Sequence, residues 1–108
     1  MVIEFNICQE DGQPFDVQIQ EVSKLLNSFL PNMKWNNEYS FETDKWNVSF
    51  SDEPIGLQVY FHNKSDSKEY SEFGNEAYTI ARKVKSIMED ITGEKGELIE
   101  ITIDLFNH

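Results

Sequence analysis

The sequence predicts an α+β domain in which an antiparallel or mixed sheet carries two helices on one face. Residues 75–93 place apolar side chains at steps of three and four, the spacing of one helix face. Segments before and after this helix alternate apolar and polar residues, as strands with one buried face do. A chain of 108 residues can build one such core but not two, so residues 1–108 are expected to form one domain with the order β-α-β-β-β-α-β.

The first predicted strand covers residues 2–8, where Ile3, Phe5 and Ile7 share one face. Residues 16–30 then carry six apolar side chains at helical spacing, and Asp16 is suited to cap that helix. Residues 15–19 also alternate, so they could instead form a strand paired with the first. The helix is favoured because its pattern has more matches, and Pro31 is expected to stop it.

The middle of the chain predicts three strands, at residues 35–43, 46–50 and 57–62. Asp44 and Lys45 form a tight connection between the first two, although they lack the glycine of the best hairpin turns. Pro54 and Gly56 mark a turn before the third strand.

The polar residues 63–72 predict a surface loop that leads into the helix at 75–93, and Gly93 suits the left-handed residue that closes a helix. The apolar stripe of this helix consists of Ala77, Ile80, Ala81, Val84, Ile87, Met88 and Ile91. A final strand is predicted from the alternation of Ile99, Ile101, Ile103 and Leu105. In this arrangement Glu4, Glu100 and Asp104 point away from the helices into solvent.

The formal net charge of −11 constrains the partners of the chain. Direct binding of nucleic acid is not expected, because phosphate binding needs clustered Lys and Arg. A basic protein is the natural partner, since complementary charge speeds encounter and rejects wrong partners. The domain is expected to be a monomer or a weak dimer.

Cys8 is the single cysteine and is expected to pack as a small buried apolar residue. One thiol cannot form an internal disulfide, which indicates a reducing, cytoplasmic location. The N-terminal residues lack the pattern of a signal peptide, and no apolar run approaches the length of a membrane span.

No residue set predicts a metal site, a cofactor or a catalytic constellation. His62 and His108 have no partner at metal-ligand spacing, and adjacent carboxylates such as Glu89 and Asp90 are expected to be solvated surface. The chain is therefore expected not to be an enzyme.

The aromatic residues of the middle segment are expected to divide between the core and a contact surface. Trp46 keeps the register of Val48 and belongs to the core, while Trp35, Tyr39 and Tyr60 are candidates for an exposed patch. The predicted partner-binding surface combines this patch with nearby acids: Glu38, Tyr39, Glu42, Asp44, Asp52, Glu53 and Tyr60. The basic cluster of Arg82, Lys83 and Lys85 is expected to form pairs along its own helix, such as Arg82 with Ser86 and Lys85 with Glu89.

In size, acidity, single-domain α+β layout and absence of catalytic residues, the chain resembles the small acidic immunity proteins with which bacteria neutralise toxins of contact-dependent inhibition and colicin systems. The resemblance implies tight binding to a basic toxin domain, often a nuclease. Two alternatives belong to other classes: a small enzyme with a carboxylate site, and an adaptor or phage-type regulatory subunit. A buried carboxylate in a deep pocket would favour the enzyme, whereas an exposed acidic face favours the inhibitor.

Overall fold

A computed structural model describes residues 2–29, 33–64 and 70–102 of the chain. Its elements are β1 (Val2–Gln9), α1 (Ile19–Phe29), β2 (Lys34–Asn37), β3 (Ser40–Glu42), β4 (Trp46–Glu53), β5 (Gly56–Asn63), α2 (Tyr70–Thr92) and β6 (Gly96–Thr102). This confirms the predicted α+β class. The chain has one strand more than predicted, because residues 35–43 turn at Glu38 and Tyr39 and form β2 and β3.

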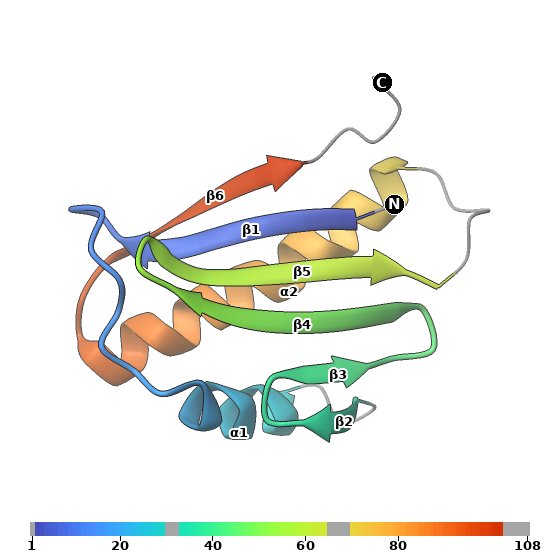
Figure 1. Cartoon of the computed structure of the whole chain (residues 1–108), viewed down its shortest axis with the longest axis horizontal. Coiled ribbons are helices and arrows are strands. Elements are labelled where there is room, and N and C mark those ends of the chain that lie inside the picture. Colours follow the sequence, from blue (N-terminus) through green and yellow to red (C-terminus); the bar gives the residue numbers. More distant parts are fainter. Residues whose placement is uncertain (1, 30–32, 65–69, 103–108) are drawn as a thin grey trace.

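The strands form one antiparallel sheet with the order β2-β3-β4-β5-β1-β6 (Figure 1). The long helix α2 crosses behind the middle of this sheet, and α1 lies beside β2 and β3. The first and last long strands of the chain, β1 and β6, are therefore neighbours, and β1 joins β6 to the hairpin of β4 and β5.

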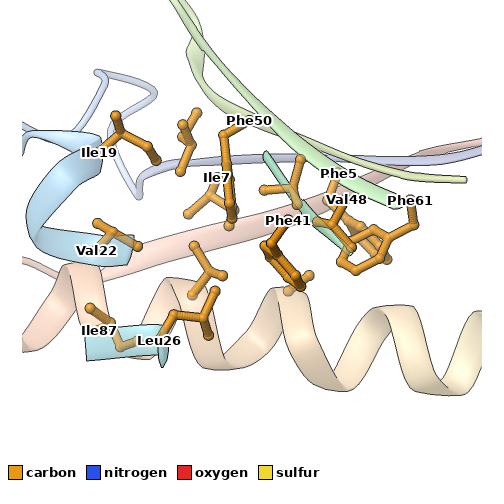
Figure 2. Close-up of a cluster of buried hydrophobic side chains, with 14 of the residues drawn as sticks. Phe5, Ile7, Ile19, Val22, Leu26, Phe41, Val48, Phe50, Phe61 and Ile87 are labelled. Carbon is orange, nitrogen blue, oxygen red and sulfur yellow. The ribbon is translucent and has the colours of Figure 1, made fainter. Parts of the chain in front are cut away.

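One core fills the space between the sheet and both helices (Figure 2). From the sheet, Phe5, Val48 and Phe61 are almost completely buried, and Phe5 meets Phe61 edge to face at 5.7 Å between ring centroids. From α1, Val22 and Leu26 point into the same cluster. Both helices bury side chains against the same sheet face, and no helix of the described residues covers the other face, which we call the free face.

The helix α1 begins at Ile19, so the prediction that Asp16 caps it is wrong. The first helical bonds run from the N–H groups of Glu21 and Val22 to the carbonyl oxygen of Gln18. Residues 13–18 form neither helix nor strand, because Phe15 is anchored in the core before the helix starts. The alternative of a strand at residues 15–19 is also absent from the structure, and the predicted stop at Pro31 lies outside the described residues.

The helix α2 confirms most of its predicted stripe. The buried side chains are Ala77, Ala81, Val84, Ile87 and Met88. Ile80 packs partly against the core, but Ile91 is 36% exposed, because it lies in the last turn, where fewer elements surround it. The backbone of Gly93 has φ of 75°, the left-handed conformation expected after the helix. The helix starts at Tyr70, inside the predicted loop, and residues 65–69 of that loop lie outside the described part.

The strand β6 turns its faces opposite to the prediction. Glu100 lies across from Phe5, and Ile101 lies across from Glu4. Glu100 is therefore on the helix-side face, while Ile99 and Ile101 are on the free face, 47% and 37% exposed. Leu98 supplies the core contact instead. Glu4 does point away from the helices, but its neighbours leave it only 8% exposed. The positions predicted at Ile103, Asp104 and Leu105 lie outside the described residues.

Candidate protein-binding surface

Four of the predicted partner-binding residues meet beside the start of α1. Tyr39, Asp52 and Glu53 line one surface depression of about 520 Å³ together with residues 14–20. Glu38 is adjacent, because it is bonded to Gln20 of the same wall. Asp16 also lines the depression. We call these five residues, Asp16, Glu38, Tyr39, Asp52 and Glu53, the acidic end.

Hydrogen bonds fix the turn between β2 and β3 at the acidic end. The Asn37 side chain accepts a bond from the Tyr39 N–H at 2.7 Å, and the Tyr39 carbonyl accepts one from the Phe50 N–H at 2.8 Å. Gln20 of α1 donates to the Glu38 carboxylate at 2.8 Å, and Ser23 donates to the Glu38 carbonyl at 3.1 Å. The turn is thus bonded to β4 on one side and α1 on the other, while the Tyr39 side chain remains 47% exposed.

The carboxylates of the acidic end form no ion pair with a described Lys or Arg, although Lys24 of α1 lines a depression together with Glu38. Among the residues that the structure describes, no Lys or Arg lies within ion-pair distance of Asp16, Glu38, Asp52 or Glu53. The Glu53 carboxylate accepts a hydrogen bond from the Ser51 hydroxyl at 2.6 Å, and Glu38 accepts the one from Gln20. Neutral donors orient these charges without cancelling them, so the surface keeps its negative potential.

The structure places Glu42 and Asp44 elsewhere. Glu42 lies 3.8 Å from the ammonium of Lys64 and across from Lys34 on β2, so two lysines surround its charge. Asp44 is exposed in the connection between β3 and β4, where the Thr43 hydroxyl accepts bonds from the N–H groups of Lys45 and Trp46. The predicted surface is therefore two separate groups, and only the acidic end is a continuous negative site.

Tyr60, the remaining predicted residue, lies on the free face of the sheet across from Glu4 and does not line the depression of the acidic end. Its hydroxyl donates to Gln58 at 2.5 Å. Burial raises the pKa of Tyr60 above its usual value, and the hydrogen bond and charge of Glu4 raise it further, with a smaller effect of Glu53.

The predicted aromatic patch does not form as one unit. Trp35 packs on Phe41 at 4.8 Å and on Phe50 at 6.3 Å between ring centroids, and its indole N–H donates to Asn27 of α1. Trp35 is thus a partly buried core residue, because it shares the helix-side face with Phe41. Trp46 is buried as predicted, which leaves Tyr39 as the exposed aromatic of this region.

The basic side chains of α2 contact residues of α2 and, for Lys83, of α1. Lys85 lies 3.6 Å from Glu89, which confirms that predicted pair. Lys83 lies over the Phe29 ring at 4.2 Å, and Arg82 lies over the Tyr78 ring at 5.7 Å rather than bonding to Ser86. Lys83 and Lys85 are therefore partly buried and in contact with other side chains. Of these three basic residues, Arg82 is the exposed one, and its contact is the Tyr78 ring.

The structure also places the cysteine and one of the two histidines that the sequence singled out. Cys8 is buried; its burial raises the pKa of the thiol, and the charges of Glu97 and Asp11 raise it further. His62 is exposed on β5, and His108 lies outside the described residues. Within the described ranges, no three His, Cys, Asp or Glu side chains are grouped to hold a metal ion, and no helix is apolar over a length that would cross a membrane.

Comparison of the chain with protein-family models, with curated proteins and with solved structures gives no match.

Proposed function

We propose that this chain is a binding protein that neutralises a basic protein partner, as a toxin-directed immunity protein does, and that the acidic end is its contact surface. The observation that carries the proposal is the set of carboxylates at the acidic end, none of which has a Lys or Arg within ion-pair distance in the described structure. A partner that supplies Lys or Arg there gains charge-assisted bonds to groups that are already oriented.

Tyr39 gives this surface an aromatic centre. Its side chain is about half exposed on a turn that is bonded to both α1 and β4. A tyrosine held on a rigid turn loses little conformational entropy on binding, and tyrosines rimmed by polar groups are frequent hot spots. The geometry therefore fits a protein partner with a basic rim around an apolar pocket.

The test begins with the protein encoded beside this chain, which is the expected partner of an immunity protein. Co-expression should restore the growth of cells that produce that neighbour, and the two purified proteins should form a complex. Asp52→Lys with Glu53→Lys should slow association at least tenfold, because steering depends on charge. Tyr39→Ala should mainly speed dissociation.

The matched control is Glu42→Lys with Asp44→Lys, which makes the same charge change at Glu42, beside Lys64 and across from Lys34, and at the nearby exposed Asp44. This double variant should change association less than the variant at the acidic end. Equal effects of the two variants would show that only net charge matters. Full binding by the Asp52 and Glu53 variant would rule out the acidic end as the contact surface.

A further inference from the structure

The two edges of the sheet differ in how well they are protected from pairing. At one edge, β2 has four residues, carries a register shift and is bonded to α1 through Trp35. At the other edge, β6 has seven residues and pairs with β1 in unbroken register. No strand in the described part of the chain pairs with the outer side of β6, which lies at the margin of the molecule (Figure 1). Long, regular edges of this kind accept a further strand.

The side chains around this edge indicate which residues an added strand should carry on each face. Between α2 and β6 lies a groove of about 460 Å³ that is lined by Tyr78, Arg82, Lys85 and residues 96–99. An added strand would place alternate side chains towards this groove and towards the free face. The groove favours a carboxylate because Arg82 has no ion pair within the described residues. The free face favours apolar side chains beside the exposed Ile99 and Ile101.

The strand β6 itself has this pattern, with Glu100 on the helix side and Ile99 and Ile101 on the free face. A two-fold axis perpendicular to the sheet keeps each face of one copy continuous with the same face of the other. When Ile99 lies opposite the partner's Ile99, the partner's Glu100 lies opposite Leu98, which lines the groove beside Arg82 and Lys85. On the other face, Ile99 meets the partner's Ile99, while Ile101 lies opposite the partner's Glu97 and diagonal to the partner's Ile99.

We propose that a second copy of this chain pairs with β6, so that two sheets join into one across a two-fold axis. The contact is self-complementary: Arg82 of each copy meets Glu100 of the other copy, so the same ion pair forms twice. A single pair of edge strands buries little surface, and two chains of net charge −11 repel each other. The dimer is therefore weak, with a dissociation constant on the order of 100 μM at about 0.15 M salt, where the repulsion is screened beyond about 8 Å.

Sedimentation equilibrium of the full chain tests the proposal, at protein concentrations from about 10 μM to 1 mM, a range that spans the expected dissociation constant. Arg82→Glu and Glu100→Arg should each weaken dimerisation at least tenfold, because each creates two like-charge contacts. Mixing the two variants should restore a dimer, since each variant then meets the opposite charge in its partner. Ile99→Lys should also prevent dimerisation, by placing two ammonium groups together.

Lys24→Glu and Glu21→Arg are matched controls, since both side chains are exposed on α1 and the charge changes are the same. These variants should dimerise like the unmodified chain, and circular dichroism should show all variants folded. A monomeric chain at 1 mM would overturn the proposal. So would controls that weaken the dimer as much as the β6 variants, or two charge variants that do not associate on mixing.

Discussion

At the scale of single residues, Gly56 shows how closely the turn between β4 and β5 packs on β1. Its φ of 142° is a backbone angle that residues with a side chain rarely adopt, and a Cβ there would lie 2.5 Å from the Ile7 carbonyl oxygen. We expect Gly56→Ala to lower the free energy of unfolding by more than about 2 kcal/mol, from strain plus backbone displacement. Gly12→Ala is the control, because Gly12 also has a positive φ but no atom within 4 Å of the added Cβ. Urea unfolding should show a clearly smaller loss for Gly12→Ala.

The raised pKa of Tyr60 should make the fold less stable at alkaline pH. Burial, and then Glu4, raise the pKa of Tyr60 above 10.0, so the folded state holds this proton more tightly than the unfolded state does. The contribution of Tyr60 to stability is therefore complete below the usual tyrosine pKa, starts to fall when the unfolded chain deprotonates there, and is lost as the pH rises through the raised pKa of the folded state. Urea unfolding at pH 8 and pH 10.5, about two units below and just above the usual pKa, should show a fall that Tyr60→Phe reduces. An identical fall in the free energy of unfolding of Tyr60→Phe would contradict this role of Tyr60. In a titration followed by absorbance at 295 nm, the variant should lack one tyrosine that ionises at high pH in the unmodified chain.

At the scale of elements, the sequence predicts what a local period can encode. The helix α2 and the strands β1, β4 and β5 appear where their periods place them, because one face of each lies against a broad core. The orientation of β6 was not predictable in this way. Its isoleucines alternate as a core face would, but pairing with β1 in the observed register turns them outwards, and an edge strand can leave both faces partly exposed. Register depends on a distant strand, which a local pattern does not contain.

The start of α1 shows a second limit of local patterns. Leu25 and Phe29 continue the helical spacing of Val22 and Leu26 but are 48% and 49% exposed, because the helix buries a narrower stripe than its sequence offers. Asp16 has the chemistry of a cap, yet Phe15 is buried in the core, and residues 13–18 form neither helix nor strand. Tertiary packing decides both features.

The contact between α2 and the rest of the core can be tested through two isoleucines of the same helix. Ile87 is 5% exposed, and Ile91 is 36% exposed one turn later. Ile87→Ala should lower the free energy of unfolding by roughly 2–5 kcal/mol, because it removes buried methyl groups and leaves a cavity. Ile91→Ala should cost less than about 1 kcal/mol. Denaturant melts that rank the two variants equally would mean that the helix presents another face to the sheet.

At the scale of the whole molecule, composition predicts the net negative charge but not which acidic side chains are left without a neutralising cation. Residues 1–60 contain ten acidic and three basic residues, against ten and six in residues 61–108. The fold then pairs charges across these halves, since Lys64 lies beside Glu42 and Lys45 lies 3.2 Å from Glu76. These cations neutralise the end of the sheet where β4 begins and leave the acidic end unpaired within the described structure. Identifying the site therefore required the strand order, which no local pattern supplies.

An unpaired acidic site in a chain of net charge −11 should cost stability, and this gives a prediction that needs no partner. Asp52→Asn at the acidic end should raise the free energy of unfolding by a few tenths of a kcal/mol, because it removes a repelled charge. Glu42→Gln removes the same charge from the group beside Lys64 and Lys34, so it should lower that free energy by a similar amount. Urea unfolding at about 0.02 M and 0.5 M NaCl should show both differences shrinking as salt screens them. If both variants shift stability in the same direction, the local cations do not distinguish the two groups, and the acidic end loses its basis as a separate surface.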